Sequence, residues 1–133
     1  MTIFERVRAL DLLSDEYAVV GGGVLEAHGL RRAGDIDLLV SAGLFEQLES
    51  RGWKGETGLD GVGTKLRLGE AEAFTDIGVG SYQPDSRELL ARAETIQDIR
   101  FFALADLSDF KRALGRAKDL HDLALIDAHL HTH

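Results

Sequence analysis

The chain has 133 residues, of which 44% are hydrophobic and 29% charged, and it contains no cysteine. This composition predicts one globular domain over residues 1–133 and excludes disulfides, thiolate zinc sites and a cysteine nucleophile. The 23 acidic residues outnumber the 15 lysines and arginines, giving a net charge of −8, which disfavours non-specific binding to nucleic acid.

The first forty residues predict two short buried strands, each preceded by a helix. Apolar residues recur every three or four positions in the first expected helix, whereas the strands are runs of apolar residues rich in valine, leucine and isoleucine. A glycine follows the second helix at the position where many helices end in a left-handed residue. In chain order we expect a helix over residues 3–13, a strand over 17–20, a helix over 24–28 ended by Gly29, and a strand over 34–40.

The turn between the first strand and the second helix, together with the acids of the second strand, is the stretch most informative about function. Gly21-Gly22-Gly23 removes every Cβ from three positions, which allows a phosphate to approach the backbone, although glycine runs are more often simple loops. Asp35 and Asp37 alternate along a strand, so both carboxylates lie on one face. Such a pair is commonly compensated by a divalent cation. The combination predicts a nucleotide site.

Basic residues lie between this turn and the acidic strand. For His28, a phosphate contact or an acid–base role competes with packing at the helix C-terminus, which is the commoner arrangement. Arg31 and Arg32 could steady a triphosphate or pair with Asp35 or Asp37, and the sequence leaves these roles open.

The middle of the chain predicts a helix over residues 42–50, ended by a turn at Arg51 and Gly52, and then Trp53. This aromatic residue is expected in the core or at its rim, since base stacking is the less common role. Glycines follow at four closely spaced positions and indicate a loop: 55, 58, 61 and 63.

A β-hairpin with arms over residues 62–68 and 71–77 provides the third candidate acid. Its second arm has acids at even positions, hence on one face of a regular strand. Glu72 is the preferred partner for the Asp35–Asp37 pair because apolar residues flank it on both sides, and Asp76 is the alternative.

The last third of the chain is expected to be mainly helical. After a loop over residues 78–85, the pattern predicts a helix over 87–93 capped by Asp85 or Ser86, an extended segment over 96–102, a helix up to Gly115 and a helix over 118–130. The apolar stripe of the final helix comprises Leu120, Leu123, Leu125, Ile126 and Leu130. The terminal histidines His129, His131 and His133 are expected to be exposed side chains rather than metal ligands.

A basic cluster formed by Lys111, Arg112, Arg116 and Lys118 also lies in this third. It could meet the phosphate of a substrate or could simply solvate a helix face.

Two motifs resemble a known family. The first comprises Val20-Gly21-Gly22, His28-Gly29, Arg32 and Asp35-Ile36-Asp37-Leu38, and the second comprises Asp109-Phe110-Lys111, Arg116-Ala117-Lys118-Asp119 and Asp122. The first resembles the active-site signature of the nucleotidyltransferase superfamily related to DNA polymerase beta. The second resembles the closing segment of its minimal members and of AbiEii-type toxin nucleotidyltransferases. The resemblance extends over residues 17–130.

The resemblance implies an α+β fold, with a mixed sheet flanked by helices and a C-terminal helical segment. It further implies that Asp35, Asp37 and a third acid, Glu72 or Asp76, hold two Mg²⁺ ions, and that Asp119 and Asp122 anchor the helices. The residues implied to contact the nucleoside triphosphate (NTP) are Gly21, Gly22, Gly23, Arg32, Lys111 and Lys118. Gly34 before the first acid and Gly23 in place of a hydroxyl residue depart from the family pattern.

The expected function is magnesium-dependent transfer of a nucleotide from an NTP to an RNA, protein or small-molecule acceptor. The alternatives are a catalytically silent nucleotide-binding module and an interaction protein of a toxin–antitoxin pair. Because the chain is short, a homodimer or a partner subunit is expected. No apolar run approaches the roughly 20 residues that span a membrane, and the first residues lack a signal-peptide core, so we expect a cytoplasmic protein with no membrane partner.

Overall fold

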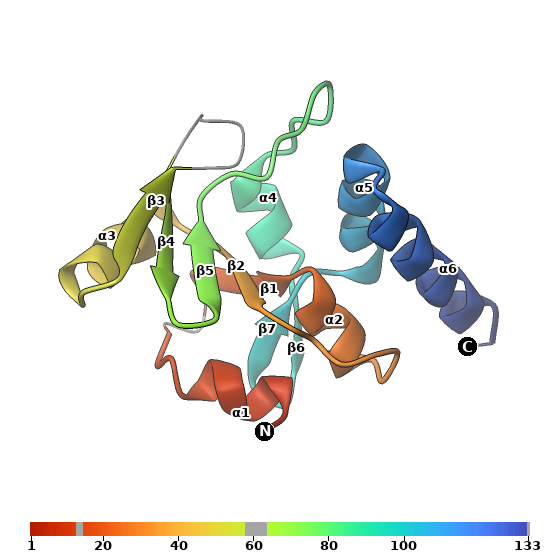
Figure 1. The fold of residues 1–133 in the computed structure, drawn as a ribbon, viewed down its shortest axis with the longest axis horizontal. Helices are drawn as coiled ribbons and strands as arrows, with labels where there is room; N and C mark the ends of the chain where they lie inside the picture. The colour runs from red at the N-terminus through yellow and green to blue at the C-terminus, as the bar shows by residue number, and fades with distance from the viewer. Residues whose placement is uncertain (13–14, 58–63, 133) are drawn as a thin grey trace.

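The computed structural model describes residues 1–12, 15–57 and 64–132. In it the strands form one β-sheet, and helices pack around that sheet (Figure 1). The strands are β1 (Tyr17–Val20), β2 (Ile36–Val40), β3 (Lys54–Thr57), β4 (Thr64–Leu68), β5 (Ala71–Phe74), β6 (Glu94–Ile96) and β7 (Ile99–Phe101). The helices are α1 (Ile3–Arg8), α2 (Gly22–Ala27), α3 (Ala42–Ser50), α4 (Ser86–Ala91), α5 (Leu104–Leu114) and α6 (Ala117–Thr132).

The sheet is mixed and runs in the order β3-β4-β5-β2-β1-β7-β6. β1 is antiparallel to β2 and parallel to β7, while β2 is parallel to β5. Helices flank the sheet, and α5 and α6 form a pair at one side of the molecule (Figure 1). The expected α+β class with a mixed sheet and a C-terminal helical segment is therefore confirmed.

Within the described ranges, no helix combines the length and the apolar character needed to cross a membrane.

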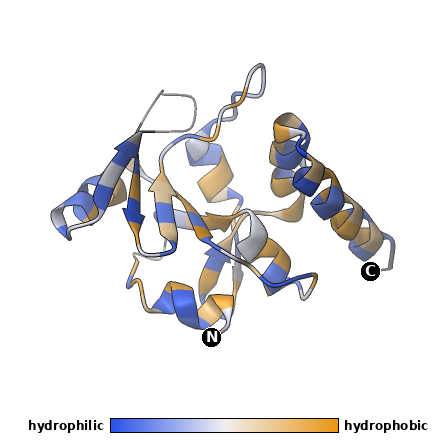
Figure 2. Cartoon of the chain, viewed as in Figure 1, coloured by the Kyte–Doolittle hydropathy of each residue, from blue (hydrophilic) through white to orange (hydrophobic). Residues whose placement is uncertain are grey.

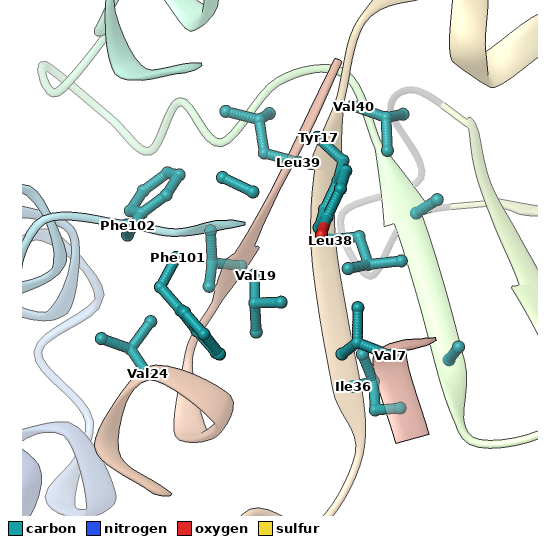
Figure 3. Packing of buried hydrophobic residues seen from close by; sticks show 14 of the residues in the cluster. Val7, Tyr17, Val19, Val24, Ile36, Leu38, Leu39, Val40, Phe101 and Phe102 are labelled. Carbon is teal, nitrogen blue, oxygen red and sulfur yellow. The ribbon is translucent and has the colours of Figure 1, made fainter. Parts of the chain in front are cut away.

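The core lies on both faces of the two central strands. All four residues of β1 are buried, and the only residue of β2 that is not fully buried is Asp37. In Figure 2 these strands are largely orange, and Figure 3 shows Leu38 and Leu39 on opposite sides of β2, with Phe102 on the side of Leu39. A polar side chain in so apolar a strand must be held there for a reason other than core packing.

Several predicted elements are confirmed in place. The strand over residues 17–20 and the helix over 42–50 have the expected bounds. Gly29 and Gly115 adopt positive φ angles of 73° and 62° and follow α2 and α5 as expected. Trp53, only 5% exposed, belongs to the core.

The first helix is shorter than predicted. α1 ends at Arg8, and Asp11 takes a left-handed φ of 53°, which interrupts the helix despite the apolar pattern. Residues 13–14, which complete that predicted helix and the turn after it, lie outside the described residues.

The extended segment predicted over residues 96–102 is a hairpin of β6 and β7. Gln97 and Asp98 form its turn, both with positive φ, a geometry that matches the twist of the flanking strands. Neither residue is a glycine, so the usual sequence signal for such a turn is missing.

The glycine-rich loop begins later than predicted, because Gly55 belongs to β3 and pairs with Leu66. The other loop glycines, at 58, 61 and 63, lie outside the described residues, as does Val62 at the start of the predicted hairpin. That hairpin is confirmed as β4 and β5, but β5 ends at Phe74 and not at residue 77. Its second arm therefore does not include Asp76.

The C-terminal helices are confirmed, but the apolar stripe predicted for the last of them is only partly buried. Asp85 caps α4, since its carboxylate accepts the backbone N–H groups of Arg87 and Glu88. α6 packs on α5 with one side only, so Leu123 and Ile126 are buried, whereas Leu120 and Leu130 are 60% and 54% exposed.

Glu26, a half-buried acid that the sequence analysis did not identify, fixes the position of α2. The carboxylate of Glu26 on α2 accepts the backbone N–H of Ile3 at 2.6 Å and that of Ala33 at 2.9 Å. These bonds join α2 to α1 and to the segment that leads into β2, and so fix the glycine turn relative to the acidic strand.

Candidate functional site

The strand register brings the predicted acids of two strands into one row. Asp37 of β2 pairs with Val20 of β1 on one side and with Glu72 of β5 on the other. Paired residues point to the same face of a sheet, so the carboxyl groups of Asp37 and Glu72 are neighbours. Arg67 of β4 extends the row because it pairs with Glu72, and Lys65 lies two residues away on the same face.

The glycine turn meets this row at Asp37. Gly21 has φ 66° and ψ −142°, a conformation open essentially only to glycine, and a Cβ there would lie 3.0 Å from Oδ2 of Asp37. At Gly22, a Cβ would lie 3.0 Å from Nη1 of Arg31. Both glycines therefore let a charged side chain approach the backbone of the turn.

Gly23 does not have the phosphate-binding position expected of it. It is buried inside α2, and a Cβ there would lie 2.5 Å from Cγ1 of Val19 and 3.2 Å from Cδ1 of Ile3. This glycine is needed for helix-to-strand packing, because the helix faces the core at this position.

The turn, the acidic row and the C-terminal helices enclose a cleft of about 370 Å³. Most of the predicted site residues line it: Gly21, Gly22, Asp35, Asp37, Glu72, Lys111 and Lys118. The other lining residues are Val20, Arg31, Gly34, Phe74, Phe110, Leu114, Arg116 and Asp122. A volume of this size lies in the range of small-molecule sites, about 300–1,000 Å³.

The carboxyl of Asp37 is in an unfavourable electrostatic environment. Asp35 lies just before β2, which begins at Ile36 and not at residue 34 as predicted. Burial raises the pKa of the Asp37 carboxyl, and the neighbouring Asp35 raises it further. The charges of Lys65, Lys111 and Lys118 act in the opposite direction without reversing the shift. Two carboxylates with such a net effect are suited to bind an added cation.

The acids of α6 are in the opposite state. Nζ of Lys111 lies 3.2 Å from Oδ1 of Asp119 and 2.9 Å from Oδ2 of Asp122, and all three side chains are less than 10% exposed. Arg31 donates to both carboxylate oxygens of Asp122, at 2.8 and 2.9 Å. Although burial acts to raise it, the hydrogen bonds from Arg31 and Lys111 lower the pKa of Asp122 to about 2. The open roles of Arg31 thus resolve into an ion pair with a helix acid.

Lys111 therefore borders the cleft as part of a buried ion-pair network. Lys118, which is exposed on the first turn of α6, is the lysine with more freedom to meet a phosphate. Arg32 is exposed and is not among the residues that line the cleft, so its predicted phosphate contact has no support from its position.

The two alternatives for the third acid lie in different surroundings. Glu72 lines the cleft, and its Oε1 accepts from Nζ of Lys65 at 3.2 Å and from Arg67. Asp76 is exposed beyond the end of β5, where its Oδ1 accepts the backbone N–H of Gly78 at 2.8 Å. Of the two alternatives, Glu72 is the one that pairs with Asp37 and lines the same cleft as Asp35 and Asp37.

As a site for Mg²⁺, the donor set fits in part. Asp35 and Asp37 offer the carboxylate oxygens that Mg²⁺ prefers, whereas Glu72 is bound to two cationic side chains. Among the residues that the structure describes, no group of three or more His, Asp or Glu side chains is close enough together to hold a metal ion.

His28 is part of the packing between α2 and α6. Its ring lies edge to face against that of His129, with centroids 5.5 Å apart, and burial together with His129 lowers its pKa. Its Nε2 is buried with no hydrogen-bond partner in the structure. The packing role is the one that the contacts support. Of the terminal histidines, His131 is exposed as expected, whereas His129 is half-buried because it packs against His28. His133 lies outside the described residues.

Sequence reasoning did not identify the basic residues next to the acids. Lys65 and Arg67 alternate on β4, as Asp35 and Asp37 do before and on β2, and this alternation was the available signal. The aromatic residues Phe74 and Phe110 carried no signal that distinguishes a cleft wall from core packing.

Comparisons of the chain with models of protein families, with curated proteins and with solved structures found no match in any of the three.

Proposed function

We propose that this protein is a nucleotidyltransferase, which transfers a nucleotide from an NTP to a hydroxyl group of an RNA, protein or small-molecule acceptor in a magnesium-dependent reaction. The observation that carries the proposal is the approach of Asp37 to the glycine turn. Oδ2 of Asp37 lies within 3.0 Å of the Cβ position of Gly21, in a cleft that Asp35 and Glu72 also line. A triphosphate that enters this cleft meets a turn without side chains beside carboxylates that can hold its cation.

The chain's own residues divide the work of binding. Asp35 and Asp37 would hold Mg²⁺, and Glu72 would join them by exchanging Lys65 and Arg67 for the cation. Gly21 and Gly22 leave space for phosphate oxygens, and Lys118 adds a positive charge at the helix side of the cleft. Bound Mg²⁺ neutralises charge on the triphosphate and lowers the pKa of an attacking hydroxyl.

In the proposed reaction the acceptor oxygen bonds to the α-phosphorus, the bond to pyrophosphate breaks, and the acceptor loses its proton. Such a reaction needs positioning and charge compensation more than covalent help from the protein. The glycine turn would supply the positioning, and a cation held by the acids, together with Lys118, would supply the charge compensation.

The test is transfer of label from each α-³²P-labelled NTP to total RNA, to proteins or to a small-molecule product, with Mg²⁺ present. We expect Asp37→Asn and Asp35→Asn to reduce transfer by about 100-fold or more, as the loss of a group that stabilises charge in the reaction does. Asp127→Asn, on the exposed side of α6, is the matched control and should retain activity. Transfer by both cleft variants at the rate of the unaltered protein would remove these acids from the mechanism.

The ion pairs of Glu72 with Lys65 and Arg67 favour a second candidate, a module that binds nucleotides without transferring them. In that case the third acid is permanently neutralised by the two cations. A thermal shift with NTP and Mg²⁺, in the absence of any labelled product, is the outcome that would favour it over the enzyme.

A further inference from the structure

The residues that line the cleft are of two chemical kinds. One kind comprises the glycine turn and the charged residues described above. The other comprises apolar side chains, and the apolar wall is defined here as Phe74, Phe110 and Leu114. A cleft built only for a metal and a triphosphate has no need of such a wall.

The apolar wall is formed by the sheet on one side and by α5 on the other. Phe74 lies two residues beyond Glu72 on β5 and therefore on the same face of the strand. Phe110 and Leu114 are four residues apart on α5, so they share one helix face. All three side chains are only half-buried, and each borders the cleft.

Phe110 has a second aromatic ring as a neighbour. Its ring stacks on that of Tyr82, with centroids 6.3 Å apart and an angle of 25° between the ring planes. Tyr82 itself is placed by two backbone hydrogen bonds with Val79, at 2.8 and 2.9 Å. A ring fixed in this way loses little side-chain freedom when a flat ligand stacks on it.

We propose that the apolar wall binds the nucleobase of the NTP. This inference rests on the proposed function, because it takes the phosphates to lie beside the acids of the same cleft. Charged groups and aromatic side chains that line one cavity match the two parts of a nucleotide, which has a charged tail joined to a flat aromatic base. The three wall side chains carry no hydrogen-bonding group, so they recognise the base by stacking and discriminate weakly among the four bases.

The experiment compares the binding of ATP and of inorganic tripolyphosphate, each with Mg²⁺, by calorimetry. We expect ATP to bind more tightly, and Phe110→Leu to lower the affinity for ATP about fivefold or more while leaving tripolyphosphate binding unchanged. Phe74→Leu should act in the same way and gives a second test if one variant folds poorly. Phe45→Leu is the matched control, since Phe45 is a half-buried phenylalanine on α3 that packs against the core.

A second readout reports on stacking itself. The triphosphate of 2-aminopurine riboside loses fluorescence when its base stacks on an aromatic ring, so its signal should fall on binding. The fall should be smaller with Phe110→Leu and unchanged with Phe45→Leu.

Equal affinity for ATP and tripolyphosphate, or equal losses of both in Phe110→Leu, would overturn the inference and leave the proposed transfer reaction intact. Base-dependent binding without any labelled product would support the inference and contradict the proposed transfer. If neither compound binds, both are contradicted.

Discussion

Two pairs of aspartates border the cleft or lie beside it, and they differ in almost every physical respect. Asp35 directly precedes β2 and Asp37 lies on it, and the pKa of Asp37 is shifted upwards by burial and by the charge of Asp35. Asp119 and Asp122 on α6 are each bonded to an arginine and to Lys111, and their pKa values are shifted downwards. The comparison teaches that the helix acids are neutralised by partners within the fold, whereas Asp37 lies beside another acid and has no such direct partner among the ion pairs of the described residues.

The largest expected effect concerns the helix pair. Asp119→Ala should lower the free energy of unfolding by about 3–5 kcal/mol, because it leaves the backbone N–H of Arg116 without its acceptor and removes one of the two buried carboxylates that neutralise Lys111. Urea denaturation measures the loss. Asp127→Ala, at an exposed position of the same helix, should change stability by less than about 0.5 kcal/mol. Equal losses in the two variants would contradict the structural role of the network.

The second prediction concerns Gly21, whose missing Cβ lets Asp37 approach the turn. Gly21→Ala should lower the free energy of unfolding by about 2–3 kcal/mol. The alanine would have an unfavourable backbone conformation, and its Cβ would lie too close to Asp37. Gly29→Ala is the matched control: this glycine also has a positive φ, but no atom lies within 4 Å of its Cβ position. Thermal unfolding of both variants should show the larger loss at Gly21.

Replacing an aspartate by asparagine should change stability in opposite directions in the two pairs. Asp37→Asn should raise stability at neutral pH, because the folded state disfavours the ionised carboxyl of Asp37. The gain should be complete above the raised pKa of Asp37 and absent below the ordinary value of 3.8.

Asp122→Asn is the matched variant for that experiment, and it should lower stability at neutral pH, whereas Asp37→Asn should raise it. The pKa of Asp122 falls from 3.8 to about 2 on folding, so its contribution is present above pH 3.8 and is lost as the pH falls through about 2. Urea titrations over this pH range measure both variants. Changes of the same sign at neutral pH would contradict the distinction between the pairs.

The smallest expected effect concerns the cations that balance the strand acids. Lys65→Met removes a charge that faces both Asp37 and Glu72, and should raise the affinity for Mg²⁺ about three- to tenfold. Calorimetry with Mg²⁺ alone measures the change. Lys54→Met, at an exposed position of β3, should leave the affinity unchanged. No gain at Lys65 would show that Mg²⁺ does not bind beside that lysine.

Local patterns were sufficient to predict much of the acidic half of the site. Alternation of acids indicated Asp35 and Asp37, the flanking apolar residues indicated Glu72, and the glycine turn indicated a close approach to the backbone at Gly21. The same reasoning placed β1 and α3, whose apolar periodicity is strong and whose ends are marked by turn residues.

Contacts between distant segments could not be predicted in this way. Arg31 and Asp122 are 91 residues apart, and no local pattern pairs them. Gly23 could not be distinguished from its neighbours, because only the packing of α2 on Val19 and Ile3 decides which glycine faces the core. The β6–β7 hairpin was missed because its turn uses Gln97 and Asp98 in a conformation that glycine or asparagine usually adopts.

The bond between Arg31 and Asp122 has a consequence for protein synthesis. The glycine turn and the acids beside it are translated before α6, which borders the same cleft. At ordinary rates of about 5–20 residues per second, the 91 residues between Arg31 and Asp122 take several seconds to translate. During that interval the acids are made but α6 is not, so the cleft is complete only after translation has passed residue 122.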